Sequence, residues 1–441
     1  MSYAIMSQRG GETHLVTYRT VRPANIVYFD GMSASWGPGW LDSQEMFIYG
    51  VNPAQGKNSK WWDDYGRADK LCSWAEPRDI DGIVRMNAGF EIIWCDFNSS
   101  KLQLVSHLNI TPPGTPLTQR TWFPRFPDDL PSTPGYPPQR RPPRRPRISQ
   151  LAETGQIEWV RAASHRAFSP QPHLTLLPSG MVSYYHPRLT SLVEDRINRS
   201  MNAHRLANIS SSDAVDVVHE INAVLARFKA GVMGSGMNWI GTSLDIIEQW
   251  GDRISHMHAL LLNMSDPSTD ATASLPTIRA LSYTPLNPYM QPGLTPNASA
   301  WDLFFGMSPN VPHGNVTAFE RCTTQTTGFL TASQRTSQED LLQESIETVL
   351  SRLCSDVGTI FVESSDLVQG TSKSTLAISV HHWRVRIEKL MKWLDWSVWL
   401  RCDQHVCSTP LWPIAWVFRR PGEPNRDEEE ELKPRCIRMA V

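Results

Sequence analysis

The sequence lacks an apolar run long enough to cross a membrane, which needs about 18 uninterrupted residues. Its most apolar stretch, residues 393–418, is broken by prolines and by charged residues such as Asp395, Arg401 and Asp403. The chain also lacks an excess of one charge, because its formal net charge is only -2. A small net charge argues against a partner recognised mainly by charge, such as nucleic acid or a membrane surface. We therefore expect neither a membrane span nor a nucleic-acid partner.

The motifs of common catalytic sites are missing as well. No Gly-X-Ser-X-Gly sequence marks a serine hydrolase, and Gly234-Ser235-Gly236 lacks the further glycines and the Lys-Ser/Thr pair of a phosphate loop. We interpret these residues as a flexible turn between helices. Cys402 and Cys407, with His405 between them, could form only part of a zinc site, since a structural zinc site needs four ligands. We expect no cofactor and no metal.

Acidic residues near the expected ends of strands in the N-terminal part are the candidates for catalysis. Two carboxylates that flank a glycosidic bond would make the protein a carbohydrate hydrolase. An Asp-Gly pair is explained equally well as a turn, and the spacing of these acids selects no particular pair. Whether the protein is an enzyme therefore stays open. The candidates are Asp30, Asp42, Asp81, Glu91 and Asp96.

Asn-X-Ser/Thr tripeptides, the acceptors of N-linked glycans, occur seven times, whereas about two or three are expected by chance. The excess predicts a chain of the secretory pathway with glycans on surface loops. An accidental excess in a Ser/Thr-rich chain is the alternative. The acceptors are Asn98, Asn109, Asn198, Asn208, Asn263, Asn297 and Asn315.

The seven cysteines fall into three local pairs and one remaining thiol, Cys436. This pattern suits disulfides formed in an oxidising compartment, and the alternative is seven reduced thiols in a cytosolic protein. The expected disulfides are Cys72–Cys95, Cys322–Cys354 and Cys402–Cys407. Residues 1–10 have neither the basic nor the apolar segment of a signal peptide. We expect a chain that begins downstream of its true start, or else a cytoplasmic protein.

Composition divides the chain into four parts and predicts an α+β fold. Residues 13–111 are expected to form a small mixed α/β domain. Residues 112–147 form a linker that we expect to be disordered, because residues 111–147 hold twelve prolines and seven arginines. Residues 148–420 are expected to form a mainly helical domain with long loops. Residues 421–441 are expected to form an acidic disordered tail.

Apolar periodicity places the individual elements. In the N-terminal domain we expect strands at residues 24–30, 45–50, 82–86, 90–96 and 102–108, and a helix at residues 61–76 that buries Tyr65. In the helical domain we expect a β-hairpin at residues 174–185 and a long loop at residues 266–312. The expected helices cover residues 212–228 and 242–262, a third that opens with a capping box at residues 337–340, and residues 374–399.

Tryptophan is abundant, with 17 residues, and several crowd the C-terminal end. A surface that stacks on carbohydrate is one explanation. Core packing is the explanation we favour, because an indole ring buries a large area wherever its N–H finds a partner. We expect the C-terminal group to cap the helical domain: Trp393, Trp396, Trp399, Trp412 and Trp416.

Several blocks of sequence are distinctive enough to suggest a family. They are TYRTVRPANIVYFDG (17–31), LDSQEMFIYG (41–50), YGRADKLC (65–72), DGIVRMNAGFEIIWCDF (81–97) and WLDWSVWLRCDQHVCSTPLWPI (393–414). These blocks resemble a family of uncharacterised, predicted secreted glycoproteins of filamentous ascomycete fungi. The resemblance implies cysteine pairing like that expected above and transfers no catalytic residue.

Together these features favour a non-enzymatic glycoprotein of the fungal secretory pathway, located outside the cell or in the cell wall. Its partners would be a cell-wall polysaccharide or another secreted protein. A carbohydrate-active hydrolase and an accessory protein of a biosynthetic gene cluster are the alternatives.

The arginine-rich linker makes the domain division testable. Trypsin should cut first between Arg140 and Arg147 and release two stable fragments, because this segment cannot bury enough apolar surface to order itself. Gel electrophoresis and mass spectrometry of a digestion time course identify the fragments. Degradation of both halves at the same rate would contradict the division.

Overall fold

The computed structural model describes residues 12–31, 33–34, 41–49, 63–86, 90–111, 174–199, 204–291, 293, 297–306, 316–367 and 371–400, with two short strands beyond them. The chain divides into two compact units. Unit 1 comprises residues 1–176, 183–225 and 400–441, and unit 2 comprises residues 177–182 and 226–399. Small sheets come first in the chain and long helices follow, so the α+β class predicted from the sequence is confirmed. The expected linker at 112–147 and tail at 421–441 lie outside the continuously described ranges.

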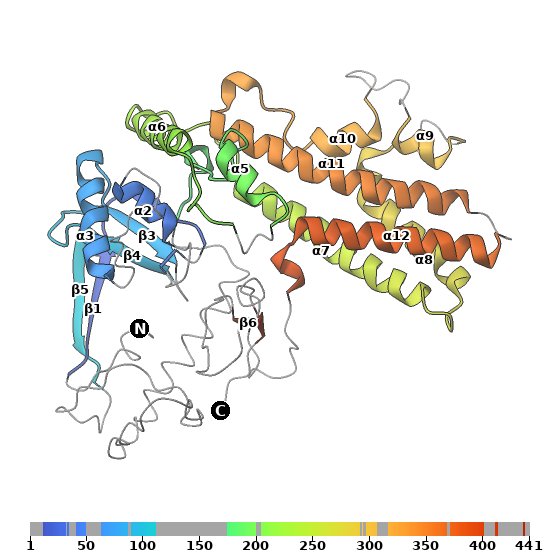
Figure 1. Ribbon diagram of the computed structural model, residues 1–441, viewed down its shortest axis with the longest axis horizontal. Helices are drawn as coiled ribbons and strands as arrows, with labels where there is room; N and C mark the ends of the chain where they lie inside the picture. The colour runs from blue at the N-terminus through green and yellow to red at the C-terminus, as the bar shows by residue number, and fades with distance from the viewer. Residues whose placement is uncertain are drawn as a thin grey trace, which may run out of the picture. The chain divides into compact units, whose positions relative to one another are not determined.

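Unit 1 contains two small sheets near the start of the chain (Figure 1), where the sequence predicts one. Strands β2 (Ile26–Tyr28), β3 (Gly82–Met86) and β4 (Phe90–Trp94) form a mixed sheet, in which β2 is parallel and β4 antiparallel to β3. Strand β5 (Leu102–Asn109) instead pairs with β1 (His14–Thr20), a strand that we did not expect, in an antiparallel ribbon. The fifth expected strand therefore belongs to a separate sheet.

The strand expected at residues 45–50 is wrong, because residues 45–49 belong to helix α2 (Asp42–Tyr49). Periodicity cannot separate strand from helix over so short an apolar run. Helix α3 (Asp64–Ala75) lies where a helix is predicted, but Tyr65 is 89% exposed. Its buried side is Arg67, Leu71 and Ala75, spaced by four residues, and the disulfide Cys72–Cys95 ties it to the end of β4.

The β-hairpin expected at residues 174–185 is also wrong. Pro178–Gly180 form a single 3₁₀ turn that is closed by a hydrogen bond from Met181 N to Pro178 O, and no strand flanks it in the described residues. Two helices follow, α5 (Thr190–Arg196) and α6 (Ser211–Lys229). Helix α6 confirms the amphipathic helix predicted at residues 212–228.

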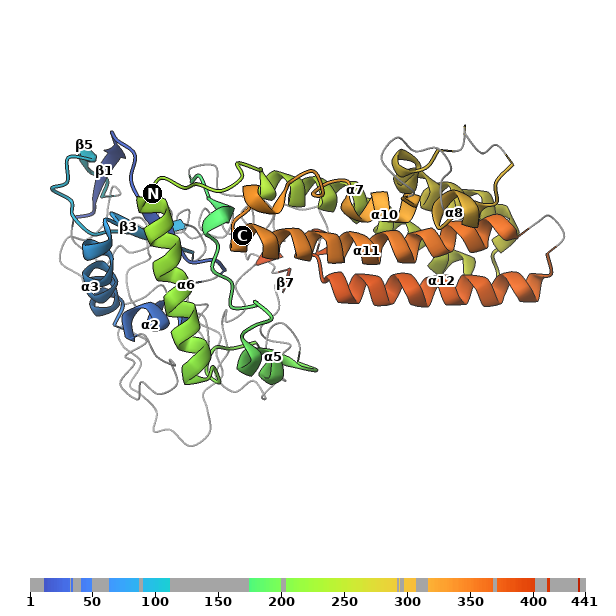
Figure 2. The ribbon, with the colours of Figure 1, turned by 90° about the horizontal axis from the view of Figure 1, so that it is seen from above.

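Unit 2 is built on four long helices that lie side by side in both views (Figures 1 and 2). They are α7 (Trp239–Met264), α8 (Ala271–Leu286), α11 (Ser337–Asp366) and α12 (Lys373–Leu394). Short helices α9 (Ala300–Phe304) and α10 (Ala318–Thr324) pack against α11. The core between the helices contains Trp250, Leu353 and Trp383, all with no exposed surface. Within the described residues, no helix is long and apolar enough to span a membrane.

Helices α8 and α9 occupy a region where the sequence predicts only a long loop. The prolines Pro276 and Pro285 lie inside α8, and their presence obscures the helical pattern because proline normally interrupts a helix. The start of α8 is nevertheless marked by Asp270, whose side chain accepts a hydrogen bond from Thr272 N. The disulfide Cys322–Cys354 joins α10 to α11, with both cysteines fully buried. The expected pair Cys402–Cys407 lies outside the described residues.

A buried carboxylate, Glu339, closes the N-terminal end of α11. It belongs to a capping box with Thr336, one residue before the expected box, and is 1% exposed. Its oxygens accept hydrogen bonds from Ser235 N at 3.1 Å and from Trp239 Nε1 at 3.0 Å. Gly234 has a φ of +88°, and a Cβ there would lie 2.5 Å from Ser179 Cβ. The turn Gly234-Ser235-Gly236 therefore has a defined conformation. The Glu339 carboxylate occupies the position at which the backbone N–H of Ser235 could otherwise bind an anion.

Glu339 should make unit 2 sensitive to acid. Burial alone would raise the pKa of Glu339, but the hydrogen bonds from Ser235, Trp239 and Thr336 lower it below its ordinary value of 4.5. A lowered pKa in the folded state stabilises the fold above the ordinary value, and this stability is lost as the pH falls through the lowered pKa. Glu339→Gln should therefore be less stable than the wild type at pH 7, and the difference should shrink as the pH falls below 4.5.

Chemical denaturation at a series of pH values measures this difference. Glu344→Gln is the matched control, because Glu344 is exposed on the same helix and its replacement should change stability by less than about 0.5 kcal/mol. A Glu339→Gln deficit that stays constant down to pH 3 would show that the charge of Glu339 is not what holds the turn.

Candidate functional site

The five acidic residues proposed for catalysis lie in unit 1, and each has its own local partner. Asp96 accepts a hydrogen bond from the backbone amide two positions later, as expected for a turn, whereas Asp30 accepts one from the side-chain hydroxyl of Tyr28 on β2. Asp81 forms an ion pair at 2.6 Å, and Asp42 and Glu91 each contact an arginine. Each of the five has a different partner: the Tyr28 hydroxyl for Asp30, Arg205 for Asp42, Lys101 for Asp81, Arg85 for Glu91 and the Asn98 amide for Asp96.

Glu91 belongs to a group of charged side chains centred on Arg85. Arg85 lies on β3 and is 2% exposed, and Glu91 lies directly opposite it on β4. The guanidinium group of Arg85 forms a bidentate contact with the carboxylate of Asp64 at the start of α3, with distances of 2.9 and 3.1 Å. It donates to Glu91 at 2.9 Å and to the Gln44 side-chain oxygen at 3.3 Å. Two carboxylates therefore converge on one buried cation.

This charge cluster is suited to holding the fold and poorly suited to acid catalysis. Burial would raise the pKa of Asp64, but hydrogen bonds and charge from Arg85, with a further contribution from Arg67, lower it. The pKa of Arg85 would fall on burial, but its bonds to Asp64 and the charge of Glu91 raise it instead. A glycosidase needs one carboxyl group whose pKa is raised so that it can donate a proton. Asp64 has the opposite shift.

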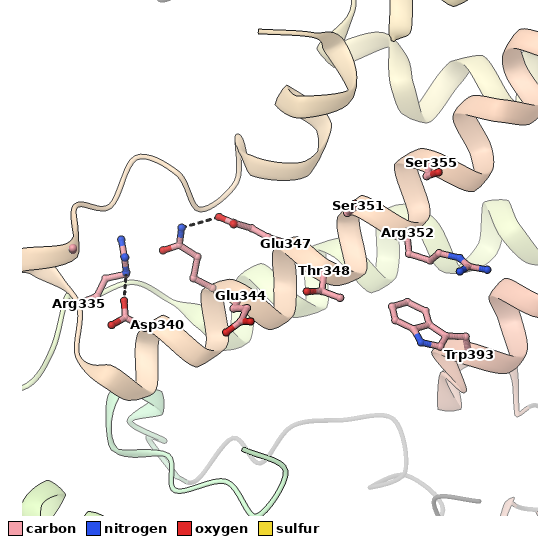
Figure 3. A pocket seen from close by; sticks show the side chains of 11 residues that line it. Arg335, Asp340, Glu344, Glu347, Thr348, Ser351, Arg352, Ser355 and Trp393 are labelled. Atoms are coloured by element: carbon pink, nitrogen blue, oxygen red, sulfur yellow. Dashed lines mark hydrogen bonds and ion pairs between the residues drawn. The ribbon is translucent and has the colours of Figure 1, made fainter. Parts of the chain in front are cut away.

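The second candidate is a polar groove of about 930 Å³ on unit 2, which follows one face of α11 (Figure 3). Its floor comes from positions three or four residues apart on the helix, and these share a side. The opposite side of α11 carries buried residues such as Ile346, Leu350 and Leu353. The groove residues on α11 are Asp340, Gln343, Glu344, Glu347, Thr348, Ser351, Arg352 and Ser355.

The two ends of the groove carry different groups. At one end Arg335 forms an ion pair with Asp340 at 2.7 Å. At the other end Trp393 of α12 lies beside Arg352, whose guanidinium carbon is 5.9 Å from the indole ring (Figure 3). Trp393 is 48% exposed, although its sequence neighbours Trp396 and Trp399 pack against the core of unit 2. Of the three cap indoles whose side chains the structure describes, Trp393 therefore faces solvent, and the side chains of Trp412 and Trp416 lie outside the described residues.

Arg352 is held in place by a buried carboxylate. Asp356 is 3% exposed and pairs with Arg352 at 2.6 Å and with Arg386 of α12 at 2.9 Å. The shared carboxylate links the two helices next to Trp393. Because Asp356 fixes the guanidinium groups of Arg352 and Arg386, the groups beside the Trp393 ring have fixed positions.

The groove offers mostly hydrogen-bond acceptors and hydroxyl groups. Three carboxylates, Asp340, Glu344 and Glu347, and two arginines, Arg335 and Arg352, give a formal charge of -1 from 3 negative and 2 positive groups. Glu347 accepts hydrogen bonds from Thr327 Oγ1 at 2.6 Å and from Gln343 Nε2 at 2.7 Å. A ligand that suits the groove carries many hydroxyl groups and an apolar face for one indole ring. Within the described residues, no group of three or more His, Cys, Asp or Glu side chains could hold a metal ion.

The expected glycan acceptors that the structure describes are all on the surface. Asn98, Asn109, Asn198, Asn208, Asn263 and Asn297 are exposed, and Asn315 lies outside the described residues. They are spread over both units.

Comparison with known proteins finds relatives of the N-terminal part. Residues 4–127, which include strands β1 to β5, match a family model described as the YPL277C N-terminal domain. Over 111 residues the chain is 33% identical to two proteins of Saccharomyces cerevisiae, called uncharacterized protein YPL277C and uncharacterized protein YOR389W. The alignments cover 24% of this chain and 23% and 18% of those proteins, so the chain spans less than a quarter of either relative. No solved structure matches the chain.

These relatives broaden the resemblance drawn from the sequence blocks. The similarity is to an uncharacterised fungal family, and it extends to yeast instead of stopping at filamentous fungi. The matched segment contains Arg85, Asp64 and Glu91, whereas the groove on α11 lies outside it.

Sequence reasoning missed both the charge cluster around Arg85 and the polar groove on α11. Arg85 in the block DGIVRMNAGF could have been noticed as a charge in an otherwise apolar strand, which in a buried position requires acidic partners. The polar stripe of α11 was visible as the side opposite Leu350 and Leu353. The exposure of Trp393 had no sequence signal, because its spacing from Trp396 equals that of Trp396 from Trp399.

Removing the central cation should destabilise unit 1. Arg85→Met should lower the free energy of unfolding by about 2–4 kcal/mol, because it leaves Asp64 and Glu91 without their partner. The loss of stability should stay below that for breaking a fully buried ion pair, since the side chains of Asp64 and Glu91 are 35% and 36% exposed. Hydrogen exchange of the β3 and β4 amides measures the effect locally.

Lys101→Met is the control, because the Lys101 side chain is 31% exposed, against 2% for Arg85, and its removal should cost less than about 1 kcal/mol. If Arg85→Met keeps the amide protection of the wild type, the ion pairs do not hold the sheet. Glu91 would then return as a candidate for a reactive group, and Asp64 would join it.

Proposed function

We propose that this protein is a non-enzymatic glycoprotein of the fungal secretory pathway that acts outside the cell or in the cell wall by binding carbohydrate. The binding surface in this proposal is the groove on α11, which we call the α11 groove. The observation that carries the proposal is Trp393, a half-exposed indole at the end of a groove lined by hydroxyl, carboxylate and amide groups.

The chemistry of a sugar chain complements both features of the groove. A pyranose ring has an apolar face of C–H groups that can stack on an indole, and hydroxyl groups that donate to carboxylates. Glu344 is exposed and Asp340 is half-exposed at its side chain, so both can accept from a ligand. A purely apolar ligand would remove water from these carboxylates without offering a hydrogen bond, and each carboxylate buried in this way costs binding free energy.

The formal charge of the groove narrows the class of carbohydrate. With three carboxylates against two arginines, a neutral chain is accommodated better than a polyanion such as a polyuronide. We therefore assign neutral wall polysaccharides, such as β-glucan and chitin, as the ligand class.

Two further observations support the secretory part of the proposal. The six described acceptor asparagines are exposed, so a glycan on any of them would not disturb the core. Cys72–Cys95 and Cys322–Cys354 are disulfide bonds, which persist mainly in oxidising compartments. In the chain-entropy model each stabilises the fold by about 3–4 kcal/mol.

Binding by full-length protein secreted from a fungal host tests the proposal. Affinity for soluble β-glucan and chitin oligosaccharides, measured by calorimetry, should fall about tenfold or more in Trp393→Ala, because the stacking surface is lost. Trp301→Ala is the matched control, since Trp301 is 54% exposed on the same unit and lies outside the groove.

The two parts of the proposal fail separately in this experiment. Protein whose mass does not change on treatment with a peptide N-glycosidase would refute the glycoprotein assignment. Glycosylated protein that binds neither polysaccharide, or that binds equally well after Trp393→Ala, would refute the assignment of the α11 groove.

A further inference from the structure

Two histidines of unit 1 face each other across the β1–β5 ribbon. His14 lies on β1 and His107 on β5, and Nε2 of His107 is 3.1 Å from Nδ1 of His14. The rings are 5.0 Å apart between centroids and inclined by 64°. Both histidines are exposed to solvent. The two nitrogens therefore approach one point that an ion can reach from outside.

A carboxylate fixes the protonation of this pair. Glu12 Oε2 lies 3.2 Å from Nε2 of His14, and a carboxylate can only accept, so Nε2 of neutral His14 carries the proton. Nδ1 of His14 then presents its lone pair, and Nε2–H of His107 donates to it. The order Glu12–His14–His107 leaves the lone pair of His14 directed at the second imidazole.

We propose that His14 and His107 form a binding site for a divalent transition-metal ion, with Zn²⁺ as its representative. Bonds from zinc to imidazole nitrogen are about 2.0–2.1 Å, and at a tetrahedral angle they place the two nitrogens about 3.3 Å apart. The observed distance of 3.1 Å is close to this value, and each exposed ring would turn so that its lone pair points at the ion instead of at the other ring. Two imidazoles suit Zn²⁺, Cu²⁺ or Ni²⁺ better than Mg²⁺ or Ca²⁺, which prefer oxygen.

Metal binding would replace the hydrogen bond between the two rings. His107 would release its Nε2 proton to solvent and take one at Nδ1, so that both imidazoles stay neutral. Glu12 would keep its hydrogen bond to His14 Nε2, in the carboxylate–histidine–metal arrangement that orients a ligand and raises its basicity. The two protein ligands leave the other coordination positions to water. The site would therefore be an open, exchangeable one.

The ribbon itself gives the metal a structural role. No residue of β1 or β5 is buried, and a two-stranded ribbon alone is only marginally stable in water. One ligand comes from each strand, at positions 93 residues apart in the chain. An ion bound by both would hold the strands together, because it binds the paired ribbon and not the separated strands.

Zinc binding to full-length protein without a histidine tag tests this site. Calorimetry with ZnCl₂ should show one site that loses at least tenfold in affinity in both His14→Ala and His107→Ala. Glu12→Gln should weaken binding about tenfold, at the low end for a residue that supports a ligand, because Glu12 is exposed. His219→Ala, an exposed histidine on α6, should bind zinc like the wild type.

Hydrogen exchange gives a second measurement that does not depend on calorimetry. Zinc should slow exchange of the β1 and β5 amides in the wild type and in His219→Ala, and leave it unchanged in His107→Ala. Equal zinc affinity in the wild type and in both ribbon variants would overturn the proposal. Zinc binding that depends on both histidines but leaves amide exchange unchanged would overturn the structural role.

Discussion

The burial of the apolar face of α11 determines how the other helices of unit 2 pack. Its apolar side, with Leu350 and Leu353, packs into the core and is joined by Cys354 to α10. Because a helix that buries one side must expose the other, the polar stripe of the α11 groove follows from the same packing. Glu339 closes the beginning of this helix, and Asp356 links it to α12 near Trp393. The core, the turn at Gly234 and the groove are therefore consequences of one helix.

Unit 1 depends on ion pairs and a disulfide in addition to its apolar core, because its sheets are small. The mixed sheet has an apolar core with Leu71 and Ile83, but it also buries Arg85, whose charge must be compensated by Asp64 and Glu91. Cys72–Cys95 adds a covalent link between α3 and the same sheet. The β1–β5 ribbon lacks such a core, which is why a bond between its strands would matter there. Side-chain pairing therefore supplements the hydrophobic core in this unit.

Elements with long periodic patterns could be predicted from the sequence. Helices α6, α7, α11 and α12 and the paired strands β3 and β4 lie where the apolar spacing places them. Short or interrupted patterns failed: the run in α2 is too short to show a period, and Pro276 and Pro285 hide α8. The pairing of β1 with β5 joins the two ends of the N-terminal segment, and local sequence carries no such information.

The candidate site was harder to predict than the fold, since its contacts join distant residues. At the α11 groove, Asp356 pairs both with Arg352 and with Arg386, which lies 30 positions away on α12. In the charge cluster of unit 1, Arg85 pairs with Asp64 on another element. The candidate acids near strand ends were recognisable as charged residues, but their partners decide their chemistry. For Asp64, which was not among them, an adjacent guanidinium lowers the pKa despite burial.

In the proposed function, Trp393 and the α11 groove contact carbohydrate. Hydroxyl-radical footprinting of the full-length protein, with and without saturating β-glucan or chitin oligosaccharide, tests this contact directly by reporting the solvent access of each indole. The ligand should protect Trp393 from oxidation and leave the oxidation of Trp301, which is similarly exposed, unchanged. Bound ligand with unchanged oxidation of Trp393, or with equal protection of both indoles, would contradict it.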